Sequence, residues 1–376
     1  MDAYLNAALA DLQERIRQLK GMIPPNLGRE VASLERTCRD RLDRAVAECL
    51  ELGEPALWTH PQHRTIRMRR YRRLVGDIAW IESTGINALQ RWQASDDRLN
   101  GLIERIAREI HFPLPSPVVA CLAQSHYEID TKLGLLVVPP ADGIFLLHLP
   151  DVYHELCHLL LEEESDARLA PLQEAYVRAL GAARSYLREE LRIESNQTRR
   201  PESFKLELRA WIDSWRGWML ELFCDAFAAA TLGPAFAWSH LHLTAKSDAE
   251  VFAVPKLLPT SHPCAAARME LVLHVLQLGG FAADVARIRL RWVELVDSIG
   301  AGESPSYGRC YPQDILRRIA QEARTATHSI GCVLADPNAA KPIERVFSLA
   351  WDQFWEAPSE FANWEARTAR DLGLRG

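Results

Sequence analysis

The sequence predicts a mainly helical protein of the α+β class, in which a helical N-terminal region precedes a domain that combines helices with a small β-sheet. Apolar residues recur every three or four positions over most of the chain, which is the period of an amphipathic helix. Two short apolar runs, near residues 134–140 and 144–147, have the length of strands and are joined by turn-forming residues. With 376 residues, 48% of them hydrophobic, the chain can bury a large core.

The first region, residues 1–112, is expected to consist of helices. Pro24 and Pro25 separate its first two apolar stripes, and a further helical stretch is expected from about residue 64 to residue 110, interrupted near Gly76 and residues 83–85. The proline-containing sequence at residues 111–115 marks a linker, so the second domain is placed at residues 113–376. The two stripes consist of Leu5, Leu9, Leu12, Ile16 and Leu19, and of Val31, Leu34, Cys38, Leu42, Val46 and Leu50.

One segment of the first region is strongly basic. Residues 64–73 contain six arginines and a tyrosine, a pattern that could bind nucleic acid or anionic lipid. The alternative is a charged helix surface paired with acidic residues of another helix or of the second domain, and we favour it because the region as a whole is not basic. Nucleic acid is therefore not expected as a partner, whereas the N-terminal helices could contact a protein partner.

The second domain is expected to begin near Val118 and to place its strands before its helices. The two expected strands are joined by a turn at residues 140–143. A helix with Asp151 as its N-cap should follow, and a long helix from about residue 203 should end at Gly233 and Pro234. A helix is expected to follow the proline-rich loop at residues 254–259 and to continue to about residue 278, and further helices are expected at residues 282–298, 313–326 and 343–355.

The helix after Asp151 contains the pentad His154-Glu155-Leu156-Cys157-His158, which is an HExxH motif. On a helix, the two histidines lie one turn apart on the same face, so both imidazoles could bind one Zn²⁺ while Glu155 takes a proton from water. The apolar stripe of this helix predicts that it is buried. The alternative is a helix with two unrelated histidines.

A catalytic zinc site needs a third protein ligand and leaves one position open. Glu221 and Asp225 lie one turn apart on the long helix: Glu221 could bind the metal, and Asp225 could accept the outer N–H of a ligand histidine. Because the pair borders an apolar stripe, the two carboxylates would need a cation if they were buried. The alternative is an amphipathic helix whose carboxylates are solvated. The stripe consists of Trp211, Trp215, Trp218 and Leu222.

A third segment contains Ser261-His262-Pro263, with Arg268 six residues after the histidine. HExxH, then ExxxD some sixty residues later, then Ser-His-Pro with this arginine resembles the gluzincin zinc metallopeptidases that include the CAAX prenyl proteases and bacterial quality-control peptidases. The resemblance covers roughly residues 120–280. It implies a zincin-like catalytic domain, in which a small sheet precedes the HExxH helix and could hold extended substrate by strand addition.

The resemblance also implies Zn²⁺ as the cofactor, with His154, His158 and Glu221 as its ligands. Glu155 would be the general base, and Asp225 would hold a ligand histidine from behind.

His262 and Arg268 match the histidine of the family's His-Pro pattern and its arginine. The resemblance therefore makes both of them candidate catalytic residues. In some members the loop with this histidine covers the site, so His262 could be a self-inhibitory latch. The alternative for His262 is a residue at the entry of a helix, before Pro263. Tyr307 or Tyr311 could stabilise the negative oxygen of a tetrahedral intermediate, although either could simply pack.

The chain departs from the family at Cys157, Cys224 and Cys264, which replace the residues usual there. A thiolate near the site could compete for the metal, but small buried side chains in tight helix contacts are the favoured interpretation. No run reaches the eighteen or so apolar residues that a spanning helix needs, so no transmembrane segment is expected.

The expected function is zinc-dependent hydrolysis of peptide bonds in a peptide or protein substrate. One alternative is a latent or non-catalytic zinc-binding protein with an interaction or regulatory role, and another is an anion- or nucleic-acid-binding regulator that uses the arginine run. The first residues lack the basic and apolar segments of a secretory signal, and the eight cysteines have no framework spacing. A cytoplasmic location is therefore expected.

Overall fold

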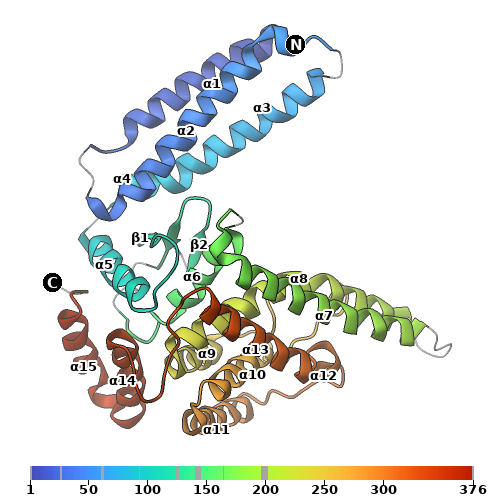
Figure 1. The fold of residues 1–376 in the computed structure, drawn as a ribbon, viewed down its shortest axis with the longest axis vertical. Coiled ribbons are helices and arrows are strands. Elements are labelled where there is room, and N and C mark those ends of the chain that lie inside the picture. Colours follow the sequence, from blue (N-terminus) through green and yellow to red (C-terminus); the bar gives the residue numbers. More distant parts are fainter. Residues whose placement is uncertain are drawn as a thin grey trace. The chain divides into compact units, whose positions relative to one another are not determined.

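The computed structural model describes residues 2–25, 28–60, 63–92, 94–122, 127–139, 145–163, 165–195 and 202–374. Its described part is mainly helical with a small three-stranded sheet, which confirms the α+β class (Figure 1). The chain divides into two compact units, Met1–Gly101 with Pro117–Pro140, and Leu102–Ser116 with Ala141–Gly376. The change of unit falls within helix α5 (Ala94–Glu109). The expected domain boundary after residue 112 and the zincin-like assignment stay predictions.

Three long helices of the first unit pack on one another, as their apolar stripes predict. Ile16, Leu34 and Leu42, from these stripes, are fully buried in their common core. This unit contains α1 (Asp2–Met22), α2 (Ala32–Gly53), α3 (His63–Trp80) and α4 (Asn87–Gln90), the π-helical segment Ile81–Ile86, and single 3-10 turns at Arg29–Val31 and Pro55–Leu57.

The interruptions expected after residue 64 are only partly present. The break near Gly76 is wrong, because α3 runs through this glycine, which a helix tolerates at a modest cost. Around Gly85 the helix changes to the π-helical segment. A Cβ at Gly85 would lie 2.5 Å from Cys38 Sγ, so only glycine fits where this segment packs against α2.

The arginine run lies on α3, and two of its arginines, Arg70 and Arg73, pair with acidic residues of α2, as the favoured interpretation expects. Both Glu51 carboxylate oxygens accept hydrogen bonds from Arg70, at 2.6 and 3.1 Å. Glu48 accepts from Arg70 at 3.0 Å and from Arg73 at 2.9 Å. The side chain of Arg64 lies outside the described residues, and the absence of a nucleic-acid partner stays a prediction.

The sheet of the first unit has the strand order β1-β3-β2. β1 (Val118–Ala120) runs parallel to β3 (Leu135–Val137), and β2 (Glu128–Asp130) runs antiparallel to it. The Asn100 side-chain amide exchanges two hydrogen bonds with the backbone of Val119, at 2.7 and 2.9 Å. One of the two expected strands, near residues 134–140, is therefore confirmed as β3.

The other expected strand is wrong over its described residues, since Leu146–Pro150 forms turns. The N–H groups of His148 and Asp151 donate to carbonyls three residues earlier, and the Leu146 N–H donates to Glu365 Oε1 at 2.8 Å. A short apolar run marks burial but does not decide between strand and turn. The expected turn at residues 140–143, together with Ile144, lies outside the described residues.

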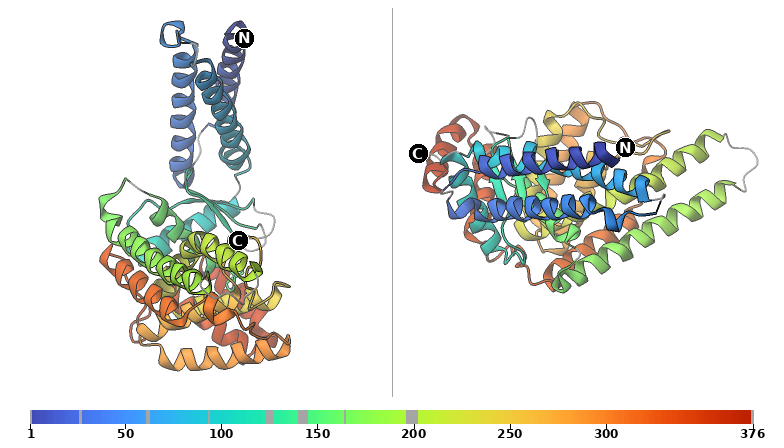
Figure 2. Two further views of the ribbon diagram at one scale, coloured as in Figure 1. Left: turned by 90° about the vertical axis from the view of Figure 1, so that its right-hand side faces the viewer. Right: turned by 90° about the horizontal axis from the view of Figure 1, so that it is seen from above.

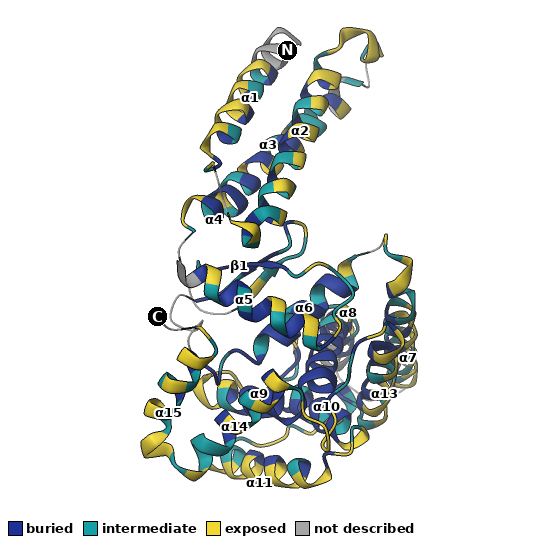
Figure 3. Ribbon diagram, turned by 60° about the vertical axis from the view of Figure 1, so that its left-hand side comes forward, coloured by how far each residue is buried: buried dark blue, intermediate teal, exposed yellow. Residues whose placement is uncertain are grey.

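Helix α8 is the centre of the second unit, where it packs against α6, α7, α10 and α13. Figure 3 shows this helix and α10 buried among their neighbours, and Figures 1 and 2 show α7 beside α8 as an antiparallel pair. The helices of this unit are the second half of α5, α6 (Asp151–Glu162), α7 (Ala170–Ser195), α8 (Glu202–Leu232), α9 (Pro234–Lys246), α10 (Ala265–Leu278), α11 (Ala282–Ser298), α12 (Tyr307–Cys310), α13 (Gln313–Ser329), α14 (Pro342–Glu356) and α15 (Pro358–Asp371), with a 3-10 turn at Ala167–Leu169.

Several helices of this unit were expected, but α7, α9, α12 and α15 were not. The helix expected to end near residue 278 is present as α10, and those expected at 282–298, 313–326 and 343–355 are present as α11, α13 and α14. Asp151 is not an N-cap, because it lies inside α6 and its Oδ1 accepts from Ser239 Oγ at 3.2 Å. Gly233, with φ 78°, ends α8, but Pro234 then starts α9 at once.

No helix in the described part of the chain is both long and apolar enough to cross a membrane.

Candidate metal centre

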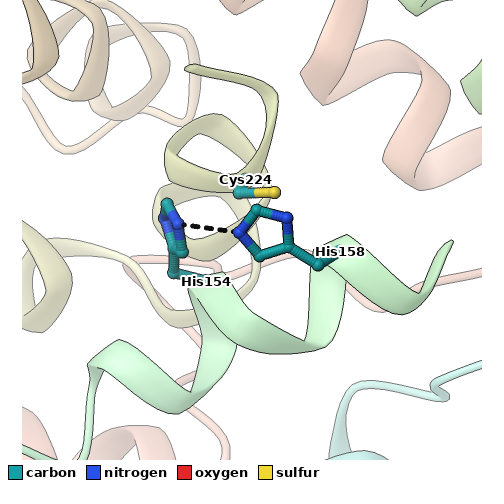
Figure 4. A group of neighbouring side chains, drawn as sticks. All are labelled: His154, His158 and Cys224. Atoms are coloured by element: carbon teal, nitrogen blue, oxygen red, sulfur yellow. Dashed lines mark hydrogen bonds between the residues drawn. The ribbon is translucent and has the colours of Figure 1, made fainter. Parts of the chain in front are cut away.

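The two histidines of the pentad face one another on α6, one turn apart. Their Nε2 atoms lie 3.3 Å from each other, and Figure 4 marks this contact with a dashed line. His154 is buried and His158 is mostly buried. Two Nε2 atoms at this separation, presented from one helix face, can share a metal ion.

The carboxylate of Glu221, on α8, faces both of these nitrogens. Its Oε2 lies 3.3 Å from His154 Nε2, and its Oε1 lies 3.9 Å from His158 Nε2. Ligand atoms bound about 2.0–2.1 Å from a tetrahedral zinc ion lie about 3.3 Å from one another. The three side chains therefore lie close enough to hold one metal ion, with only the distance between His158 and Glu221 somewhat long.

Cys224 is a second neighbour of the histidines on α8. His154, His158 and Cys224 form a group whose ligand atoms all lie within 4.8 Å of one another, close enough to hold a metal ion. Burial raises the pKa of the Cys224 thiol well above its ordinary value, which disfavours the thiolate that metals bind.

The other two cysteines at which the chain departs from the gluzincin pattern, Cys157 and Cys264, are also buried. Cys157 packs against α8, with its Sγ 3.8 Å from the Phe223 carbonyl oxygen. Cys264 precedes α10, and its N–H donates to the Tyr311 hydroxyl oxygen at 3.3 Å. The favoured interpretation of small buried side chains holds for both, while Cys224 is also a possible ligand.

A buried ion pair lies behind His154. Asp225 Oδ1 accepts the His154 Nδ1 proton at 2.8 Å, and the two Asp225 oxygens accept from Arg268 Nε and Nη2 at 2.7 and 2.6 Å. Burial opposes the Asp225 charge, but Arg268 and His154 outweigh it and hold the pKa of the carboxyl far below its ordinary value. Asp225 therefore stays charged and fixes the tautomer in which His154 Nε2 is directed at the site.

The remaining residue of the pentad, Glu155, is half-buried beside the histidines. Burial, Asp151 and Glu221 together raise the pKa of Glu155 to about 7, against the opposing charge of His154. A carboxyl group that takes up and releases its proton near neutral pH suits general base and acid chemistry.

His262 reaches the same place from the loop before α10. Its Nε2 lies 3.7 Å from Glu221 Oε2, although its side chain is 64% exposed. Its Nδ1 contacts Ser261 Oγ at 2.8 Å, so the hydroxyl orients the ring. Ser261 is a site residue that the sequence offered only as part of the Ser-His-Pro pattern.

The two candidate tyrosines are buried rather than exposed in a loop. Tyr311 stacks on Trp218 with ring centroids 4.8 Å apart, and its hydroxyl is engaged by the Cys264 N–H. Tyr307 packs edge-on against Phe252. Both contacts agree with the packing alternative.

A pocket of about 440 Å³ adjoins these residues between α9, α10 and the loop that joins them. Arg268 and His262 contribute to its wall, and Leu243, Ala253 and Val254 make much of the rest apolar. Periodicity could not reveal this pocket, because it forms from two helices and a loop that meet only in the folded protein.

Comparison with known protein families, with curated proteins and with solved structures finds no match for this chain.

Proposed function

We propose that the protein is a zinc-dependent metallopeptidase whose zinc ligands are His154, His158 and Glu221, with Glu155 as the general base. The observation that carries this proposal is that the two histidine Nε2 atoms and the Glu221 carboxylate lie 3.3–3.9 Å from one another. Glu155 is close enough to interact electrostatically with His154 and Glu221. A purely structural zinc site has no need of such a glutamate and usually has four protein ligands.

Glu221 is preferred to Cys224 as the third ligand for two reasons. Its oxygens face the same nitrogens that face each other, whereas the group with Cys224 is defined only within 4.8 Å. Burial opposes the charge of Glu221, but the bond from His154 and the nearby histidines lower its pKa overall, so it is ready to bind a cation. Two imidazoles and one carboxylate are a donor set typical of catalytic zinc.

In the proposed mechanism the chain moves one proton and holds the reacting groups in place. Zinc, when bound, lowers the pKa of water towards about 7 and polarises the substrate carbonyl. Glu155 takes the proton of the attacking water and passes it to the leaving amine. Asp225 and Arg268 keep His154 oriented. His262, whose Nε2 lies 3.7 Å from Glu221 Oε2, would donate a hydrogen bond to the developing negative oxygen.

The apolar pocket gives the proposed substrate a place beside the scissile bond. Its apolar wall suits an apolar segment of the substrate, its volume of about 440 Å³ has room for more than one side chain, and Arg268 and His262 lie in its wall.

The test is metal content and peptide cleavage of the wild type, Glu155→Gln and His158→Ala, with a peptide library as substrate. We expect about one zinc per chain in the wild type and in Glu155→Gln, loss of hydrolysis by at least about 100-fold in Glu155→Gln, and loss of zinc in His158→Ala. Glu162→Gln, at the end of the same helix, is the matched control and should keep both properties. Full hydrolysis by Glu155→Gln would refute the mechanism.

A second candidate is a latent or non-catalytic zinc protein, which the position of His262 favours. With its Nε2 3.7 Å from Glu221 Oε2, this histidine could fill the open ligand position. Peptide hydrolysis by His262→Ala separates the two candidates. Hydrolysis should be faster than in the wild type if His262 blocks the metal, and slower if His262 assists the reaction. Neither the wild type nor His262→Ala should hydrolyse peptides if the site is not catalytic.

A further inference from the structure

Helix α8 contains a glycine, Gly217, in its interior, where it packs against the loop that carries His262. Gly217 lies one turn before Glu221, and glycine is a poor helix former. A Cβ at this position would lie 3.0 Å from the carbonyl oxygen of Ser261, a closer approach than side chains normally make. The absence of a side chain at Gly217 therefore lets the backbone just before His262 lie directly against α8.

Two neighbours of Gly217 hold the same stretch of backbone. The Thr260 N–H donates to Ser214 Oγ at 2.9 Å, and Trp218 Nε1 donates to Thr260 Oγ1 at 3.1 Å. We call Ser214, Gly217 and Trp218 the docking strip, and residues 255–263 the histidine loop. One turn earlier, Trp211 Nε1 donates to the Pro255 carbonyl at 2.9 Å, so α8 binds the loop at both ends.

Contacts within the loop connect the docked backbone to the imidazole. Thr260 Oγ1 donates to the His262 carbonyl at 3.2 Å, and Ser261 Oγ contacts His262 Nδ1 at 2.8 Å. His262 is 64% exposed, so little packing besides these contacts keeps its Nε2 near Glu221.

We propose that the docking strip positions His262 at the metal centre, with Gly217 as the residue that sets how closely the loop approaches. The inference rests on the proposed function, because it assigns a role relative to the metal. The helix that supplies Glu221 also fixes His262, and the two side chains therefore keep a set distance.

The decisive change is Gly217→Ala, with Gly181→Ala as its matched control. Gly181 lies within α7, and a Cβ there would meet nothing within 4 Å. Both substitutions improve helix propensity, so only a displaced loop distinguishes them. Trp218→Phe is a second variant that removes one donor to Thr260 and keeps an aromatic ring against Tyr311.

Two measurements report separately on the docking of the histidine loop and on the position of the His262 ring. In the metal-free protein, hydrogen exchange of the Thr260 amide should become about tenfold faster in Gly217→Ala and in Trp218→Phe, and should stay unchanged in Gly181→Ala. In the Co²⁺ protein, the His262 ring protons, assigned by their loss in His262→Ala, should have paramagnetic shifts in the wild type that shrink in Gly217→Ala.

Unchanged exchange and unchanged shifts in Gly217→Ala would overturn the inference. Faster exchange with unchanged shifts would also overturn it, because the loop would then be docked without positioning the histidine. If the wild type binds no Co²⁺, the metal centre of the proposed function fails, and unchanged exchange in Gly217→Ala would still refute docking of the loop by this glycine.

Discussion

Two of the bidentate arginine–carboxylate pairs in the described part of the chain, one in each unit, have different surroundings. In the first unit, Arg70 binds Glu51 between neighbouring helices, and the side chains are 27% and 47% exposed. In the second unit, Arg268 binds Asp225 with similar distances, but the Asp225 side chain is 1% exposed and also holds His154.

The difference in exposure between the two pairs shows how burial changes the role of an arginine–carboxylate pair. Water competes for the charges of the exposed pair, so its contribution to stability is small and sensitive to salt. A buried carboxylate cannot be left without its partners, so the second pair holds one geometry. We infer that the first pair serves the packing of two helices and the second the orientation of a metal ligand.

The largest expected effect comes from breaking the buried pair. Arg268→Ala leaves the buried Asp225 with less compensation, and the free energy of unfolding should fall by about 3 kcal/mol. Urea denaturation of the metal-free protein measures this change. Arg268→Lys keeps the charge but loses the bidentate geometry, so its free energy of unfolding should lie between those of the wild type and Arg268→Ala. An unchanged urea midpoint in Arg268→Ala would show that the buried pair contributes no more to stability than the exposed pair.

The second expected effect is on zinc affinity, because Asp225 also holds His154, a proposed metal ligand. Asp225→Asn keeps the shape of the side chain but weakens its hold on the His154 Nδ1 proton, so zinc affinity should fall by about 10- to 100-fold. Competition with a chromogenic chelator measures it. Glu51→Gln, the corresponding change in the exposed pair, should leave zinc affinity unchanged.

Acid provides a third test of burial in the second unit. His240 donates to the Ala265 carbonyl at 2.9 Å, and burial, together with the charge of Arg268, lowers the pKa of His240 to about 4. The unfolded chain has a histidine pKa of about 6.5, so below that value the unfolded state binds more protons than the folded state. Stability should therefore fall as the pH drops from about 6.5 towards 4.

At pH 5 this histidine should account for a loss of about 2 kcal/mol relative to neutral pH. Urea midpoints of the wild type and His240→Gln at pH 7 and pH 5 measure it, and the acid-induced loss should be smaller in the variant. Equal losses in the two proteins would show that His240 is not held neutral.

The smallest expected effect comes from the exposed pair. Glu51→Ala removes the bidentate partner of Arg70, yet Glu48 remains to pair with this arginine. The thermal midpoint should stay within experimental error of the wild type, and salt should reduce any difference. A clear destabilisation would mean that the two pairs are more alike than their exposure indicates.

Several helices with one apolar face were predicted from the sequence, but the amphipathic helices α7 and α15 were not. Helix α11 was predicted at both ends, and α6 with its pentad to within a residue or two, because their periodicity is local. The run at residues 144–147 failed because burial alone does not separate strand from turn. Helix α9 was missed because Gly233-Pro234 was taken only as an end, although proline is also favoured at the start of a helix.

The site was predictable where a motif fixed the spacing and unpredictable where folding brought distant residues together. His154, Glu155, His158, Glu221 and Asp225 lie together, as the motifs suggested, although their roles stay predictions. The contact of Gly217 with the Ser261 carbonyl depends on a loop returning to a helix more than forty residues earlier, and no local pattern carries that information.

The tryptophans buried along α8 give this protein an optical property. Trp218 lies one turn before Glu221, so about 5–6 Å separates their Cβ atoms. At this range, an ion such as Co²⁺ or Cu²⁺ at the proposed site would quench the emission of the indole by energy transfer, whereas Zn²⁺, with a filled d shell, would not. Trp218 would then report exchange of one metal for another at the proposed site without an added label.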